Sequence, residues 1–136
     1  MRVVLDANVV VSALLSRFGA PAALIRLWLG GGFDFVASER LLAEVERTLA
    51  SPKIRKRIAL SDAETFLALV RGTVELVTDS DEPPPIRSAD PNDDYLLALA
   101  ARERLPISSG DEHLLSLGER VPILSPREFL EQLERS

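Results

Sequence analysis

Short apolar runs alternate with longer amphipathic segments along this chain of 136 residues. Short runs rich in Val, Ile and Phe predict buried strands, and apolar residues repeated every three or four positions predict helices. The predicted strands are residues 3–5, 33–37, 74–77, 106–108 and 121–124. The predicted helices are residues 9–15, 22–29, 38–49, 61–71, 90–104, 111–117 and 126–134. This alternation predicts an α/β fold with a parallel sheet covered by helices on both faces.

Three polar residues have the chemistry and position of helix N-caps. Ser38, Ser61 and Asp90 each precede a predicted helix, and the side chain of such a residue can accept a hydrogen bond from a free backbone N–H of the first turn. Pro91 directly follows Asp90 and suits the first helical position. The three consecutive prolines in residues 78–90 break any regular period, so this segment is expected to be an exposed loop.

Composition narrows the class of protein. The length suits one domain over residues 1–136, and the 46% share of hydrophobic residues is enough for a core. The absence of cysteine excludes disulfide scaffolds, thiolate metal sites and cysteine nucleophiles, and favours a reducing cytoplasm. The first apolar run is too short for a signal peptide or a membrane span, so we expect no membrane partner. The net charge of −5 argues against purely electrostatic binding of nucleic acid.

Acidic residues follow the predicted strands where ligands bind in parallel sheets. Asp6 comes directly after the first strand, and Asp111 comes shortly after the fourth. The carboxyl ends of parallel strands face the same edge, so these side chains can converge if the two strands are neighbours. The sequence alone leaves that adjacency open.

Asp94 is the third candidate, because it shares a helical face with apolar residues at the following turns, namely Leu97, Ala98 and Ala101. Asp90 and Asp93 have a simpler explanation as a cap and a first-turn anion. We expect no basic residue to compensate the converging carboxylates, which would then need protons or cations. Oxygen ligands favour one or two Mg²⁺ or Mn²⁺ ions, and the alternative is a scatter of unrelated helix caps.

The chain closely resembles the PIN-domain ribonucleases in three segments, whose order and spacing match the motifs of that family. These segments are residues 4–14, 90–100 and 108–115. The likeness is strongest to the bacterial and archaeal branch described as toxins of toxin–antitoxin systems. It implies a three-layer α/β/α sandwich with a mostly parallel sheet of about five strands. It also implies Mg²⁺- or Mn²⁺-dependent hydrolysis of RNA, a cognate antitoxin protein and a homodimer.

The resemblance also implies roles for individual residues. The catalytic and metal-binding acids would be Asp6, Glu44, Asp94 and Asp111, with Asp93 as a further metal ligand. Supporting polar residues would be Asn8, Ser12 and Ser109. Glu44 is assigned by likeness alone, since the apolar stripe of its helix does not select it. His113 stands where many relatives carry Asp, and we expect it to lie outside the metal site.

A basic segment interrupts the acidic chain. Lys53, Arg55, Lys56 and Arg57 could contact RNA phosphates at the rim of the site, or simply form a solvated helix face.

Other functions remain open. They are a PIN nuclease of RNA processing, a catalytically silent PIN module that only binds, and a phosphoacceptor signalling domain. The signalling domain would need a Lys after the fifth strand, where this chain has Ser125 and Pro126.

Overall fold

The computed structural model describes residues 1–135 of the chain. The strands are β1 (Arg2–Leu5), β2 (Asp34–Ala37), β3 (Glu75–Leu76), β4 (Ile107–Ser108) and β5 (Ile123–Leu124). The helices are α1 (Ala7–Leu15), α2 (Ala20–Leu29), α3 (Glu39–Leu49), α4 (Pro52–Arg55), α5 (Leu60–Thr73), α6 (Asp94–Glu103), α7 (Glu112–Leu115) and α8 (Pro126–Glu134). A single 3₁₀ turn, η1 (Pro91–Asp93), precedes α6.

The strands form one parallel sheet in the order β3-β2-β1-β4-β5. Strand β1 is central and pairs with β2 on one side and β4 on the other. Leu5 lies beside Ser108 in the β1–β4 register, so the residues that follow these two strands leave the sheet next to each other. This settles the adjacency that the sequence left open and confirms the α/β fold with its parallel sheet.

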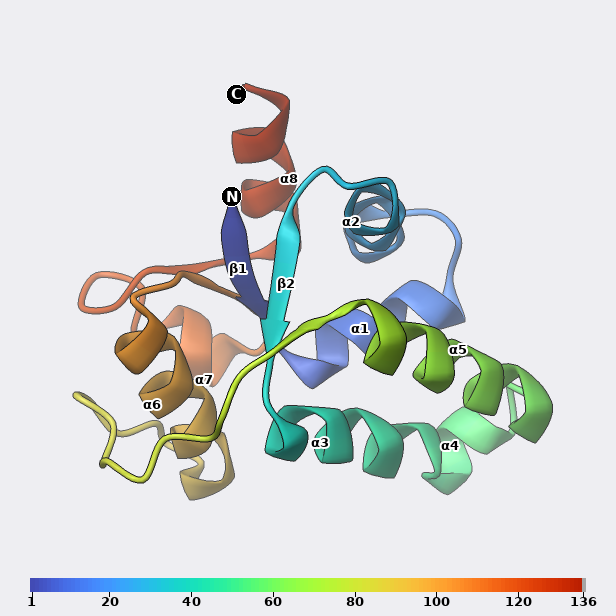
Figure 1. The fold of residues 1–136 in the computed structure, drawn as a ribbon, viewed down its shortest axis with the longest axis horizontal. Coiled ribbons are helices and arrows are strands. Elements are labelled where there is room, and N and C mark those ends of the chain that lie inside the picture. Colours follow the sequence, from blue (N-terminus) through green and yellow to red (C-terminus); the bar gives the residue numbers. More distant parts are fainter. Residues whose placement is uncertain (136) are drawn as a thin grey trace.

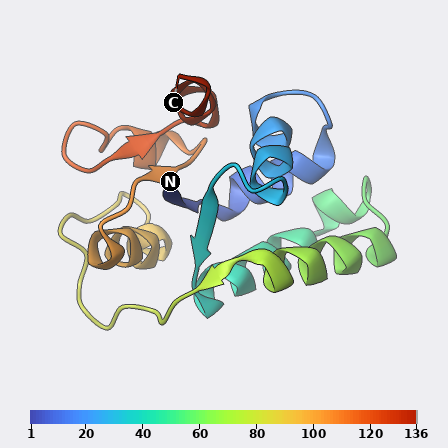
Figure 2. The same cartoon turned by 45° about the horizontal axis from the view of Figure 1, so that its top comes forward.

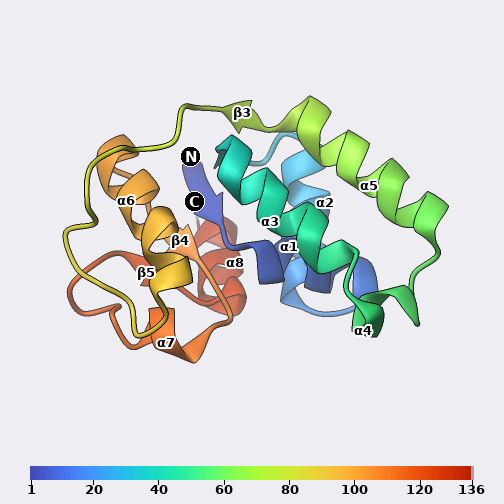
Figure 3. The same ribbon diagram turned by 90° about the horizontal axis from the view of Figure 1, so that it is seen from below.

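Helices cover both faces of the sheet. In Figures 1 and 3, α6 and α7 lie to one side of the strands, and α1, α3, α4 and α5 lie to the other. Helix α8 packs against α2 and against β5, close to the N-terminus in Figure 2. Strands β1 and β2 end on the side where α3 and α6 begin (Figure 1), so Asp6, which follows β1, leaves the sheet at that edge.

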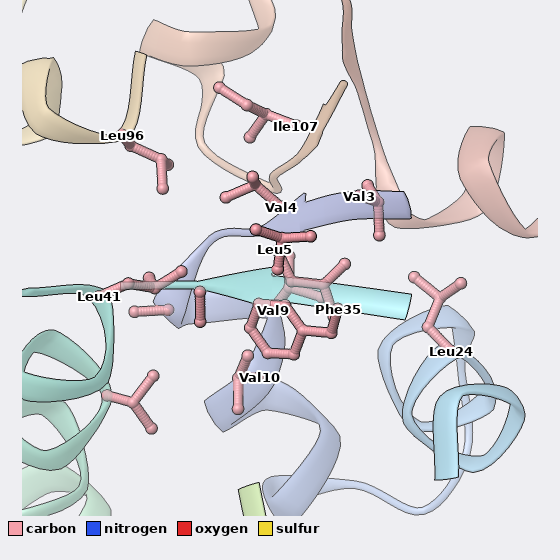
Figure 4. Close-up of a cluster of buried hydrophobic side chains, with 14 of the residues drawn as sticks. Val3, Val4, Leu5, Val9, Val10, Leu24, Phe35, Leu41, Leu96 and Ile107 are labelled. Atoms are coloured by element: carbon pink, nitrogen blue, oxygen red, sulfur yellow. The ribbon is translucent and has the colours of Figure 1, made fainter. Parts of the chain in front are cut away.

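The core between these layers is mostly aliphatic. Val3, Val4 and Leu5 of β1 are fully buried, and side chains from α1, β2 and α3 surround them (Figure 4). Trp28 packs edge-to-face on Phe35, with ring centroids 5.2 Å apart. Burial of this set fixes the direction of β1 and hence the position of the residue that follows it.

The structure differs from the predicted elements at several boundaries. Helix α5 begins at Leu60 after an extended Ala59, so Ser61 is not the cap. Ser61 lies inside the first turn, where its backbone oxygen accepts a hydrogen bond from the Thr65 hydroxyl at 2.9 Å. The basic segment contains the short helix α4, which the pattern of apolar residues did not predict. Ser38 caps α3 as predicted, because its side chain accepts a hydrogen bond from the Leu41 backbone N–H. Asp90 accepts the backbone N–H of Asn92 and so caps η1, whereas α6 begins only at Asp94.

Within residues 1–135, no single helix is long and apolar enough to cross a membrane. Helices α1 and α2 are long and apolar enough only when they are counted together, and the chain bends by 99° between them.

Candidate active site

Asp6 occupies the junction between β1 and α1. Its backbone N–H donates to the Ser108 carbonyl oxygen at 2.9 Å, which continues the ladder of the sheet to the first residue after the strand. The side chain is only 8% exposed and accepts a hydrogen bond of 2.7 Å from the Ser109 hydroxyl. Asp6 is thus a buried carboxylate, held in place by the two central strands.

The end of β4 supplies the groups that face Asp6. The Ser109 hydroxyl donates to Asp6 and accepts the backbone N–H of Asp111 at 3.0 Å. The carboxylate of Asp111 in turn accepts the backbone N–H of His113 at 2.9 Å and so caps α7. One fully buried serine therefore fixes the spacing between the two aspartates that the sequence placed after neighbouring strands.

Asp93 completes the group from the side of α6. It is the last residue of η1, its side chain is half-buried, and its Oδ2 atom is buried without a hydrogen-bond partner within residues 1–135. Burial, followed by the negative charges of Asp6 and Asp111, raises the pKa of Asp93 to about 6. Asp6, Asp93 and Asp111 are called the carboxylate cluster below.

Asp94, the predicted third acid of the site, has its partners outside the cluster in this structure, and its catalytic and metal-binding roles stay predictions. Its carboxylate accepts the backbone N–H of Ser88 at 2.9 Å and pairs with the Arg87 guanidinium at 3.2 Å. Asp94 therefore ties the loop before η1 to the start of α6. The expectation that no basic residue compensates it is wrong, because Arg87 returns to it from seven positions earlier in the chain.

Burial in the structure distinguishes Asp93 from Asp94, although the sequence does not. The residues three, four and seven positions after each aspartate are all apolar in the sequence. Those after Asp93, namely Leu96, Leu97 and Ala100, are all buried, whereas Ala101, seven positions after Asp94, is exposed.

Glu44 lies on α3, where its side chain is 28% exposed and pairs with Arg47 at 2.6 Å. Its charge acts on the Tyr95 hydroxyl together with those of Asp6 and Asp93, which places Glu44 within electrostatic range of the cluster. Its present partner is nevertheless an arginine. The two roles predicted for Glu44, as catalytic acid and as metal ligand, stay predictions.

The remaining candidates are placed as follows. Asn8 and Ser12 lie on the exposed face of α1, one turn apart, and the backbone N–H of Asn8 lowers the pKa of the nearby Asp6. His113 is exposed on α7.

The predicted RNA-binding residues Lys53, Arg55, Lys56 and Arg57 follow the C-terminal end of α3, whereas the cluster faces its N-terminal end (Figure 1). A helix of this length spans about 16 Å, so the basic segment is well separated from the cluster. Contact with RNA stays a prediction for these four residues.

The electrostatics of the cluster suit a hard cation. Burial is the main cause that raises the pKa of Asp6, against the opposing effects of Ser109 and the Asn8 amide, and the Asp111 charge raises it further. No Lys or Arg within residues 1–135 forms an ion pair with Asp6, Asp93 or Asp111. The unpartnered oxygen of Asp93 and an all-oxygen donor set fit Mg²⁺ or Mn²⁺.

In this conformation, no three acidic or histidine side chains of the described residues are arranged so that they could hold one ion together. Mg²⁺ usually needs only one or two carboxylates, because water and substrate phosphate complete its shell.

Comparison with known proteins identifies the fold family. The sequence model of the PIN domain matches residues 2–107 of the chain. The chain belongs to the PIN domain family. The matched region includes β1, η1, α6 and the start of β4, and so holds Asp6 and Asp93.

Two relatives extend the PIN comparison over the whole chain. An uncharacterized protein of Methanocaldococcus jannaschii is 23% identical and is aligned over 99% of this chain and 93% of its own length. The crystal structure of VapBC2 from Rickettsia felis, bound to a DNA fragment from its promoter, has a chain that superposes with a TM-score of 0.61. That superposition covers 92% of this PIN domain and 97% of the other chain at 15% identity, which supports the fold alone.

Proposed function

We propose that this PIN domain is a Mg²⁺- or Mn²⁺-dependent endoribonuclease that hydrolyses phosphodiester bonds in RNA. PIN domains are in general nucleases and generally use divalent metal ions. The observation that carries the proposal is the carboxylate cluster: Asp6 and Asp111 follow the central strands, Asp93 lies within electrostatic range of both, and no Lys or Arg of the described residues forms an ion pair with any of the three. Such a group is costly unless a cation joins it.

The position of each residue indicates its proposed role in the reaction. One or two carboxylates of the cluster would bind each ion, with water and substrate phosphate completing its shell, and Ser109 would keep Asp6 and Asp111 in register. A divalent ion bound there supplies Lewis acidity that activates a water and stabilises the leaving oxygen of the phosphodiester. Glu44 reaches the same region from α3 after it exchanges its present partner Arg47.

Cleavage of a labelled single-stranded RNA by the purified chain tests the enzymatic proposal. We expect cleavage with Mg²⁺ or Mn²⁺, none with EDTA, and a loss of about 100-fold or more in Asp6→Asn. Asp34→Asn, which removes the same charge where β2 begins, is the matched control and retains the activity. Metal-dependent cleavage that survives in Asp6→Asn would show that another site, or a contaminant, is responsible.

We further propose that the enzyme is the toxin of a type II toxin–antitoxin pair in the cytoplasm. The motifs of the chain resemble the toxin branch of the family, and the superposed Rickettsia felis chain comes from a structure of VapBC2 on promoter DNA. Induced expression should arrest growth, and Asp6→Asn should abolish the arrest. Normal growth with an active enzyme would favour the alternative, a PIN nuclease of RNA processing. Intact RNA under all metal conditions would favour a silent binding module.

The expected homodimer stays a prediction. Light scattering on the purified chain, alone and with the product of a neighbouring reading frame, measures both the dimer and the antitoxin complex.

A further inference from the structure

Arg40 and Tyr95 form a stacked pair beside the carboxylate cluster. The central carbon of the Arg40 guanidinium lies 4.6 Å from the centroid of the Tyr95 ring, within the range of a cation–π interaction. Arg40 is the second residue of α3, and Tyr95 is the second residue of α6. Both helices begin on the side where β1 and β2 end (Figure 1), so the pair bridges the two helices at the edge that holds the cluster.

The pair lies within the electric field of the acids. Burial and the negative charges of Asp6, Glu44 and Asp93 raise the pKa of the Tyr95 hydroxyl, whereas the positive charge of Arg40 lowers it. A fixed positive charge therefore stands next to the place where the proposed reaction would bring the phosphates of a substrate.

Among the described residues, no carboxylate pairs with the guanidinium of Arg40. Arg40 is exposed, and within residues 1–135 its guanidinium forms no ion pair. Glu44, one turn further along α3, pairs with Arg47 instead, and Asp79 accepts only the backbone N–H of Arg40, at 3.2 Å. In a chain with a net charge of −5, an arginine that is held by a ring rather than by an acid is available for an external anion.

We propose that Arg40, supported by Tyr95, binds a phosphate of the RNA strand next to the phosphodiester that is cleaved. A guanidinium can stack on an aromatic face and still present a fork of N–H donors to phosphate oxygens. Arg40 is then a substrate-binding residue, and Tyr95 is a positioning residue that limits the freedom of the Arg40 side chain. The inference rests on the proposed nuclease function, and it makes α3 the substrate-facing helix at its N-terminal end.

Arg40→Gln tests the phosphate contact, with Arg120→Gln as the matched control. Arg120 is an exposed arginine in the turn before β5, at the opposite edge of the sheet, so its loss changes net charge equally. For Arg40→Gln we expect KM for a labelled RNA to rise about tenfold. A loss of binding alone changes kcat by less than about threefold.

Salt dependence separates a phosphate contact from a general loss of structure. Binding of fluorescent single-stranded RNA is measured in EDTA at several salt concentrations, with circular dichroism to confirm folding. The slope of log K against log salt should become less negative by about 0.7 in Arg40→Gln, because one phosphate contact is lost. It should stay unchanged in Arg120→Gln.

Variants of Tyr95 test whether its ring positions the Arg40 side chain for RNA binding. Tyr95→Phe keeps an aromatic face and should retain the affinity for RNA, whereas Tyr95→Leu should weaken it. The double variant with Arg40→Gln and Tyr95→Leu should bind RNA as strongly as Arg40→Gln alone, because the two residues act through one contact. Arg40→Lys keeps the charge without the planar fork and should bind with intermediate affinity.

The inference is overturned if Arg40→Gln and Arg120→Gln show the same KM and salt slope while Asp6→Asn still abolishes metal-dependent cleavage. If Asp6→Asn has no effect, the proposed function itself fails.

Discussion

The carboxylate cluster and Glu44 carry the same chemical group in opposite environments. Asp6 is buried between the central strands, and burial together with neighbouring negative charge raises the pKa values of Asp6 and Asp93. Glu44 is more exposed on a helix face, and an arginine three positions later neutralises it at 2.6 Å. Within residues 1–135, therefore, no Lys or Arg forms an ion pair with the cluster, whereas Glu44 is paired with Arg47.

The difference indicates how the site is assembled. The ends of two strands and a buried serine hydroxyl hold Asp6 and Asp111 close enough for the charge of Asp111 to act on Asp6. A carboxylate paired on the surface can change partner at a cost of about 1 kcal/mol or less. The strand ends therefore form the permanent part of the site, and α3 contributes an exchangeable part.

The largest expected effect separates two adjacent residues. Asp93→Asn should reduce RNA cleavage by about 100-fold or more, because it removes a buried carboxylate charge within electrostatic range of Asp6 and Asp111. Asp94→Asn should reduce it by less than about tenfold, since Asp94 holds Arg87 and Ser88 rather than the cluster. Initial rates at saturating Mn²⁺ measure both. The reverse ranking would restore Asp94 as the third acid.

Ser109→Ala should have the next largest effect. It removes the hydroxyl that donates to buried Asp6 and accepts the Asp111 backbone N–H. We expect a loss of about 1–3 kcal/mol in unfolding free energy. Urea denaturation of the metal-free protein measures it, and Ser12→Ala on the exposed face of α1 is the control. A stability equal to that of wild type would mean that Ser109 does not hold the cluster together.

The fold was largely predictable because the strands β1, β2 and β5 are short apolar runs that a polar residue follows, namely Asp6, Ser38 and Ser125. Where the predicted boundary of a helix or strand differs from the observed one, the cause is local. At the start of α5, an extended Ala59 precedes the helix, and the candidate cap Ser61 falls inside its first turn. Strand β3 shrinks to Glu75–Leu76 at the sheet edge, where both residues are exposed and no core burial extends it.

The site was predictable in its strand-end part and less so elsewhere. Asp6 and Asp111 follow directly from the rule that ligands bind at the carboxyl ends of parallel strands. The choice between Asp93 and Asp94 depends on the short 3₁₀ turn η1, which sets the direction of each side chain and leaves no clear trace in composition. Contacts from distant segments, such as Arg40 on Tyr95, need the packing of two helices to be known.

Variants of Glu44 and its partner Arg47 on α3 are expected to have a smaller effect. Arg47→Gln should tighten Mn²⁺ binding by about two- to fivefold, because it frees Glu44 from its ion pair. Glu44→Gln should weaken binding by a similar factor. Calorimetric titration measures both variants. If Arg47→Gln leaves the affinity unchanged and Glu44→Gln does the same, Glu44 takes no part in metal binding.

The smallest effect is a pH dependence of stability without metal. The pKa of Asp93 in the folded protein is about 6, above the value of about 4 in an unfolded chain, so the folded state binds more protons between these values. The melting temperature of wild type minus that of Asp93→Asn should therefore fall as pH rises from about 4 to about 7. The subtraction removes the contributions of other carboxylates, such as Glu75 and Glu128, whose lowered pKa values act in the opposite direction. A difference that does not change with pH would show that Asp93 does not titrate as described.

Binding of Mn²⁺ to the purified chain, followed by electron paramagnetic resonance, tests most directly whether the carboxylate cluster is a metal site. The account predicts one or two bound ions per chain, an affinity at least about tenfold weaker in Asp6→Asn and in Asp93→Asn, and wild-type affinity in Asp34→Asn. Equal affinity in wild type, Asp6→Asn and Asp93→Asn would contradict it.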